Sequence, residues 1–160
     1  MVQTFIQHFQ KQSAENDAGA LNAGTRFFVI EDDVELSFIW ERILRTIDPN
    51  AQIDWATSAE EARARLNTKT KQGNGAPYDL IIADIFLEGT ETGLDLWRSY
   101  KSITPKIPIV ITSAVPIDKY LAKVGIDLDF PPFLAKPFTV HECTELIESI
   151  LGQSKEGSVH

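Results

Sequence analysis

Short apolar runs alternate with helical patterns along most of this chain, and this alternation constrains the fold more than any other feature. Five runs have the length and residue types of buried strands: residues 26–31, 51–56, 78–84, 107–112 and 133–135. The third run, YDLIIAD, is almost continuously apolar, which is typical of a strand covered on both faces.

The segments between these runs predict helices over residues 34–47, 58–66, 93–101, 117–123 and 139–151. Ser58 with Glu61, and Thr139 with Glu142, form capping boxes at two of the expected helix starts. Alternating strands and helices predict a parallel sheet, and right-handed crossovers favour a doubly wound order. We therefore expect one α/β domain at residues 26–151, a doubly wound five-stranded parallel sheet with helices on both faces.

The two ends of the chain are expected to lie outside this domain. An N-terminal extension, residues 1–25, combines a short amphipathic helix pattern (Val2, Phe5, Ile6 and Phe9) with a linker. It is either a frayed extension or a helix that docks on this domain or on a partner. We expect residues 67–77 to form a polar loop and residues 152–160 a disordered tail, which leaves no room for an output domain.

Charge and cysteine content narrow the classes of partner. Fifteen Lys and Arg against 23 Asp and Glu give a net charge of −8, which disfavours direct binding to nucleic acid or anionic membranes. The single cysteine, Cys143, cannot form an intramolecular disulfide. Neither a secretory signal nor a membrane-spanning run is apparent, so we expect a cytoplasmic protein.

Polar residues follow four of the predicted strands at the point where each one ends. They are Glu31, Asp32 and Asp33 after the first strand, Asp84 after the third, Thr112 and Ser113 after the fourth, and Lys136 after the fifth. Ligands of open parallel sheets bind beyond these carboxyl ends. Carboxylates ~4 Å apart repel by about 4 kcal/mol at an effective dielectric near 20, so such a cluster favours a hard cation such as Mg²⁺. A carboxylate beside that metal can act as a nucleophile toward phosphorus, which predicts phosphoryl transfer to an aspartate.

The four motifs in this order resemble the receiver domains of two-component response regulators, the CheY-like family. They are Ile30-Glu31-Asp32-Asp33, Ala83-Asp84, Thr112-Ser113 and Lys136-Pro137-Phe138. The resemblance covers residues 26–151 and implies the flavodoxin-like topology of a receiver. It also implies a cis peptide bond before Pro137.

The resemblance assigns a role to each matching residue. Asp84 would accept a phosphoryl group from a phosphohistidine, Lys136 would pair with Asp84 or with that group, and Thr112 would move to bond it. Mg²⁺ would be held by Asp32, by Glu31 directly or through water, by Asp84 and by the backbone carbonyl of Phe86. Three acids follow the first strand, so the metal-binding pair could instead be Asp32 and Asp33. Either of these two can also cap the helix that begins at Val34.

The loop after Asp84 departs from the family pattern, and Phe133 allows two interpretations. Glu88-Gly89 stands where relatives usually have a proline, and Gly93 makes the loop after Asp84 about one residue longer. Bulk at Phe86 and charge at Glu88 can admit or exclude the water that would hydrolyse the phosphoryl group. Phe133 corresponds to the aromatic switch partner of Thr112, but it is equally understood as a core residue. Because it lacks a hydroxyl, any coupling there would be steric.

Three functions fit these residues to different degrees. The favoured one is a stand-alone phosphoacceptor with Mg²⁺, a signalling domain that performs only self-phosphotransfer and slow autodephosphorylation and is not an enzyme acting on other substrates. Its partners would be a sensor histidine kinase or histidine phosphotransfer protein and a downstream protein effector, and a homodimer is left open. The alternatives are a phosphorylation-independent pseudo-receiver and an aspartyl phosphohydrolase. The latter is disfavoured because Asp84-Ile85-Phe86 lacks a second acid.

Overall fold

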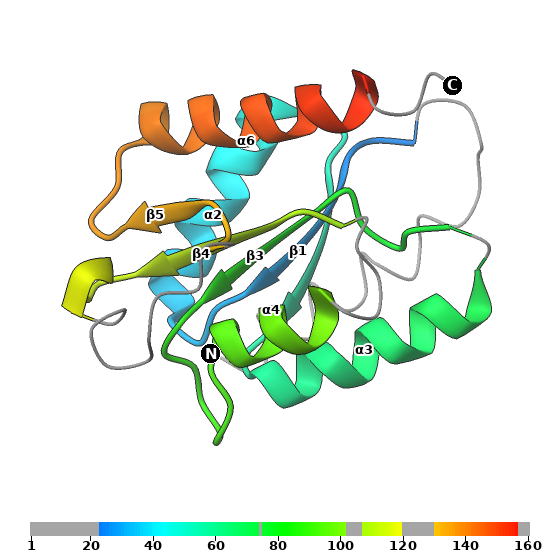
Figure 1. Ribbon diagram of the computed structural model, residues 1–160. Helices are drawn as coiled ribbons and strands as arrows, with labels where there is room; N and C mark the ends of the chain where they lie inside the picture. Colours follow the sequence, from blue (N-terminus) through cyan, green and yellow to red (C-terminus); the bar gives the residue numbers. More distant parts are fainter. Residues whose placement is uncertain (1–22, 74, 102–106, 120–129, 157–160) are drawn as a thin grey trace.

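A computed structural model describes residues 23–73, 75–101, 107–119 and 130–156 (Figure 1). Five strands form one parallel sheet in the order β2-β1-β3-β4-β5, which confirms the predicted doubly wound fold. The strands are β1 (Arg26–Ile30), β2 (Gln52–Ala56), β3 (Leu80–Asp84), β4 (Ile109–Ser113) and β5 (Phe133–Ala135).

Helices cover both faces of the sheet, as expected. One face carries α3 (Ala59–Gln72) and α4 (Gly93–Lys101), and the other carries α2 (Val34–Ile47) and α6 (Val140–Glu156) (Figure 1). Each pair of helices encloses an apolar core against its face. The central strand β3 is buried along its whole length, because helices lie on both sides of it.

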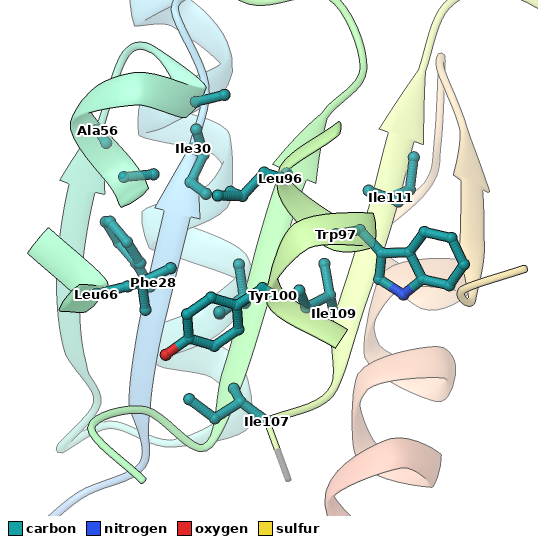
Figure 2. Close-up of a cluster of buried hydrophobic side chains, with 14 of the residues drawn as sticks. Phe28, Ile30, Ala56, Leu66, Leu96, Trp97, Tyr100, Ile107, Ile109 and Ile111 are labelled. Atoms are coloured by element: carbon teal, nitrogen blue, oxygen red, sulfur yellow. The ribbon is translucent and has the colours of Figure 1, made fainter. Parts of the chain in front are cut away.

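The core beneath α3 and α4 is rich in aromatic side chains. Figure 2 shows Phe28 of β1, Tyr100 and Trp97 of α4, and the isoleucines of β4 gathered between the helices and the sheet. Phe28 stacks on Tyr78 with ring centroids 4.7 Å apart. Aromatic residues of α4 belong to this core, and the N-terminus of α4, at Gly93, lies directly beside the end of β3.

The structure corrects two expected boundaries. The helix predicted to end at Leu66 continues as α3 to Gln72, so residues 67–72 do not belong to a polar loop. Its last turns carry no buried apolar residue, but Lys69 binds the Asp54 carboxylate at 2.7 Å and Thr70 lies 3.2 Å from the Tyr100 hydroxyl. These contacts to other elements hold the end of the helix in place of an apolar stripe.

The second correction concerns the C-terminal segment. The helix predicted to end at Leu151 continues as α6 to Glu156, so residues 152–156 are helical and not part of a disordered tail. No proline and no cap interrupts these residues, and a single glycine, Gly152, costs a helix only about 1 kcal/mol.

Two of the predicted helices fall wholly or largely outside the described residues. These are the amphipathic pattern at Val2, Phe5, Ile6 and Phe9, and most of the helix over residues 117–123. Within the described part of the chain, no helix has the length and apolar character to cross a membrane.

Candidate functional site

Four strands change from apolar to polar on the same face of the sheet, at its carboxyl edge. Side chains along a strand alternate between the two faces, so residues two apart share a face. On the face that α2 and α6 cover, buried Val29, Ile82, Val110 and Leu134 are each followed two residues later by Glu31, Asp84, Thr112 and Lys136. The parallel register therefore gathers one polar side chain from each of the four strands.

Lys136 forms the centre of this group. Its Nζ donates to Asp84 Oδ2 at 2.6 Å and to Glu31 Oε2 at 2.9 Å. The three side chains are 13%, 10% and 1% exposed, in the order Lys136, Asp84, Glu31, so this is a largely buried three-charge cluster. The Lys136–Pro137 peptide bond is cis, as the family resemblance implied.

The cluster shifts the pKa values of two of its members. Burial raises the pKa of Glu31 above its ordinary value, although Lys136 acts in the opposite direction. Burial alone would lower the pKa of Lys136, but its bonds to Asp84 and Glu31 outweigh that effect and raise it. One ammonium group therefore remains charged between two carboxylates, which leaves an excess of negative charge in this cluster.

A third carboxylate, that of Asp32, adds to this excess. Carboxylate oxygens of Glu31, Asp32 and Asp84 all lie within 4.8 Å of one another, and Asp32 is half-buried. The neighbouring Asp33 is exposed, and its side chain caps α2 by accepting from the amides of Glu35 at 2.8 Å and Leu36 at 3.3 Å. Of the two acidic pairs that the sequence left open, the structure brings Glu31 and Asp32 to Asp84.

Thr112 contributes a hydroxyl that has no partner among the described residues. The residue is fully buried, its Oγ1 makes no hydrogen bond, and it pairs with Asp84 in the sheet register. Leaving a buried hydroxyl unpaired costs roughly 1–3 kcal/mol, so such a group is uncommon without a function. The Thr112 hydroxyl is available to donate a hydrogen bond to an oxygen atom placed beside Asp84.

The donor set fits a hard divalent cation. Mg²⁺ binds through one or two carboxylates, carbonyl oxygens and water, and an apolar or thiolate site would not serve it. The cluster supplies three carboxylates that Lys136 only partly compensates. Divalent positive charge would relieve their mutual repulsion.

The loop after Asp84 places the backbone of Phe86 next to the same carboxylate. The Phe86 amide lies 3.4 Å from Asp84 Oδ1, a long contact, and the Phe86 ring is 49% exposed. At the far end of the loop, α4 begins so close to β3 that a Cβ on Gly93 would lie 2.1 Å from the Asp84 carbonyl oxygen. Only glycine allows this approach.

Phe133 lies on the opposite face of the sheet from the polar group. It pairs with Ile111, while Thr112 pairs with Leu134, and its ring packs against the core beneath α3 and α4. Its ring centroid lies 6.4 Å from that of Phe130. This packing favours the interpretation of Phe133 as a core residue, and its role as a switch stays a prediction.

Sequence reasoning missed two contacts of this region. The first is the bond from Lys136 to Glu31, since Lys136 was expected to pair with Asp84 or with the phosphoryl group. The second is Glu60, whose carboxylate binds the loop that follows Asp84. Glu60 stands next to Glu61 on the first turn of α3; the capping-box spacing identifies Glu61, but no local pattern assigns a partner to Glu60.

Comparison with known protein families identifies one family. The family model described as response regulator receiver domain matches residues 27–148. No curated protein matches the chain.

Solved structures resemble the chain in fold at low sequence identity. A response regulator receiver protein from Sinorhizobium medicae WSM419 is 22% identical with a TM-score of 0.65, covering 81% of this chain and 96% of that one. A CheY-like receiver domain protein from Methanospirillum hungatei JF-1 is 17% identical with a TM-score of 0.64, covering 84% and 98%. A putative response regulator from Chloroflexus aurantiacus J-10-fl is 24% identical with a TM-score of 0.62, covering 80% and 98%.

Proposed function

The chain belongs to the response regulator receiver family, and on that premise we propose that Asp84 accepts a phosphoryl group from a phosphohistidine. Receiver domains of this family are signalling modules of two-component systems, and phosphorylation is general to them. The observation that carries the proposal is the position of the Asp84 carboxylate. It lies at the carboxyl edge, bound to Lys136 at 2.6 Å and close to two further acids.

The proposed reaction needs one nucleophile and no redox chemistry. A carboxylate oxygen of Asp84 forms a bond to phosphorus while the bond from phosphorus to the imidazole nitrogen breaks. The electron pair of that bond stays on the nitrogen, and because the other ring nitrogen carries a proton, histidine leaves as neutral imidazole. The product is an acyl phosphate on Asp84.

The proposed ligands of Mg²⁺ are Glu31, Asp32, Asp84 and the backbone carbonyl of Phe86. When bound, the ion offsets the charge of the acids and of the phosphoryl oxygens. Lys136 can leave Asp84 and pair with a phosphoryl oxygen without losing its contact to Glu31, because it already bonds both carboxylates. The unpartnered Thr112 hydroxyl can donate to another of those oxygens. When the phosphoryl group arrives, Lys136 thus keeps its bond to Glu31, and the Thr112 hydroxyl gains a hydrogen bond.

The proposed partners follow from this chemistry. The donor is a sensor histidine kinase or a histidine phosphotransfer protein, and the acceptor of the signal is a protein effector. The chain's own reactions are self-phosphotransfer and slow loss of the phosphoryl group. A cytoplasmic location and a homodimer stay predictions.

Mass spectrometry of the intact protein tests the proposal. Incubation with Mg²⁺ and phosphoramidate should add about 80 Da, the mass of one phosphoryl group. The variant Asp84→Asn should gain nothing. Asp79→Asn is a matched control, since Asp79 precedes the same strand and binds Arg26 at its opposite end, and it should keep the adduct. An unmodified wild-type protein, or an adduct that persists in Asp84→Asn, would contradict the proposal.

A further inference from the structure

The loop between β3 and α4, residues 85–92, is closed at its base. The Gly93 amide donates to the Ile85 carbonyl at 3.1 Å, and the Ile85 amide donates to the Thr112 carbonyl at 2.9 Å. The first residue of the loop, Ile85, is therefore held to β4 directly after Asp84. The other end of the loop, at Gly93, lies against the Asp84 carbonyl.

The middle of this loop is held by one side chain of α3. Glu60 Oε1 accepts from the Thr90 amide at 2.9 Å, from the Thr90 hydroxyl at 2.9 Å and from the Glu91 amide at 3.2 Å. Gly89 has φ +98°, and a Cβ there would lie 2.6 Å from Glu60 Oε2. Glycine at this position thus serves both the backbone conformation and the approach of the carboxylate.

A second contact joins the same two elements. Ser58, the N-cap of α3, forms a parallel β-bridge with Glu88. Between this bridge and Ile85, which is fixed to β4, only Phe86 and Leu87 remain, and Leu87 packs against the core. The Phe86 peptide therefore has little freedom to move while Glu88 to Glu91 stay in place.

Capping of α3 does not require Glu60. Ser58 Oγ accepts from the Glu61 amide at 3.1 Å, and Glu61 in turn accepts from the Thr57 amide at 3.1 Å. Ser58 and Glu61 thus cap the first turn of α3 without Glu60, although Glu61 binds the amide before the N-cap instead of that of Ser58 itself. The Glu60 carboxylate instead makes its bonds to a loop thirty residues further along the chain.

The Glu60 carboxylate is held as an anion. The amide of Thr90, followed by the amide of Glu60 itself and the Thr90 hydroxyl, lowers the pKa of Glu60 to about 2. Its negative charge is present throughout the physiological range, so the loop is held equally well at any pH in that range.

We propose that Glu60 is a positioning residue for the proposed metal site: through Thr90 and Glu91 it holds the loop that sets the Phe86 backbone beside Asp84, and so it sets the affinity for Mg²⁺. This inference rests on the proposed function, because Phe86 matters only if its carbonyl binds the metal. Outer partners of metal ligands commonly change metal affinity 10- to 100-fold when they are removed.

Calorimetric titration with MgCl₂ tests the inference, using wild type, Glu60→Ala, Glu60→Gln and Glu61→Gln. Glu60→Ala should raise the Mg²⁺ dissociation constant about tenfold. Glu60→Gln keeps an acceptor oxygen and should recover part of that loss. Glu61→Gln alters the cap of the same helix without touching the loop, and its dissociation constant should equal that of wild type.

Amide hydrogen exchange gives a second readout that needs no metal. Exchange at Thr90 and Glu91 should become faster in Glu60→Ala, and it should stay at the wild-type rate in Glu61→Gln. Thermal denaturation of each variant confirms that the titrations are made on folded protein.

The outcomes separate this inference from the proposed function. If wild type binds Mg²⁺ and Glu60→Ala binds it equally well, the positioning role is wrong while the proposed function stands. If wild type binds no Mg²⁺, the metal site fails, and the positioning role fails with it.

A double-mutant cycle guards against loss of fold in a single variant. Gly89→Ala places a methyl group against the Glu60 oxygens, so it should also weaken Mg²⁺ binding. Part of this loss should disappear in Glu60→Ala/Gly89→Ala, because the carboxylate that the methyl group meets is gone. Strictly additive losses would contradict a Glu60–Gly89 unit.

Discussion

Two glutamates near the loop after Asp84 have the same side chain and opposite electrostatics. Glu31 is 3% exposed and contacts a lysine, and burial raises its pKa. Glu60 is more exposed and accepts from backbone amides, which lower its pKa to about 2. Desolvation disfavours a carboxylate, whereas amide donors stabilise it.

This difference separates the cluster that we propose to react from the contact that holds the loop. The cluster of Glu31, Asp84 and Lys136 carries excess negative charge that a cation can offset. The hydrogen bonds of Lys136 within it are therefore able to rearrange. Glu60 Oε1 already accepts three hydrogen bonds from the loop, whereas its buried Oε2 has no partner among the described residues. The proposed function, in which Lys136 moves from Asp84 to a phosphoryl oxygen, needs a charged cluster of the first kind beside a loop held by the second.

The largest expected effect comes from Gly93, which joins the two regions. Gly93→Ala puts a methyl group 2.1 Å from the Asp84 carbonyl oxygen, so α4 must move away from β3. We expect a loss of about 3 kcal/mol in the free energy of unfolding, measured by urea denaturation. Gly75→Ala is the control, since nothing lies within 4 Å of a Cβ there. If Gly93→Ala lowers the free energy of unfolding no more than Gly75→Ala does, the close approach of α4 to Asp84 is not required.

Removing the lysine from the buried cluster should have the next largest effect. Lys136→Met leaves Glu31 and Asp84 without their cation, and we expect a loss of about 2–3 kcal/mol at neutral pH without Mg²⁺. The loss is smaller than for a fully buried pair because Asp84 keeps some exposure to water. Added Mg²⁺ should recover part of it in the same denaturation experiment. Unchanged stability without the metal would show that the carboxylates do not depend on Lys136.

Mg²⁺ should stabilise the wild-type chain. At a concentration ten times the dissociation constant, a ligand of the folded state adds about 1.4 kcal/mol, which thermal denaturation detects as a higher Tm. Asp32→Asn removes one carboxylate of the cluster and should reduce this gain. Asp33→Asn retains an N-cap residue outside the cluster and should keep it. Equal gains in the two variants would contradict the assignment of Asp32.

The smallest expected effect concerns acid unfolding. Because the folded pKa of Glu60 lies below its ordinary value of 4.5, its contribution to stability is present above that value. The contribution is lost as the pH falls through about 2. Glu60→Gln should therefore give a shallower dependence of unfolding free energy on pH between about 4.5 and 2, while Glu41→Gln, on a surface i,i+4 pair, should match wild type. Curves of equal slope for wild type and Glu60→Gln would mean that the loop amides do not stabilise the anion.

The sequence predicted the features that depend on residue types along one strand. The apolar runs that end in Asp84, Thr112 and Lys136 indicate both the buried strands and the edge where their polar groups meet. The carboxyl ends of parallel strands meet at one edge of the sheet for any loop conformation. The position of this polar cluster therefore follows from the strand pattern alone.

Features that depend on contacts between distant elements could not be predicted. The last turns of α3 carry no apolar pattern and are held by Asp54 and Tyr100, which lie on other elements. Glu60 looks like any acid in the first turn of a helix until the loop folds against it. The sequence favoured Glu31 and Asp32 but left Asp32 and Asp33 open, and it took the cap geometry of Asp33 to separate the two pairs.

Mapping of the acyl phosphate tests the central claim most directly. The protein is treated with Mg²⁺ and phosphoramidate and then with borohydride, which reduces an aspartyl phosphate to homoserine, and peptides are read by tandem mass spectrometry. The account predicts homoserine at position 84 and aspartate or glutamate at positions 31, 32 and 33. Homoserine at position 32 or 33, or intact aspartate at position 84, would contradict it.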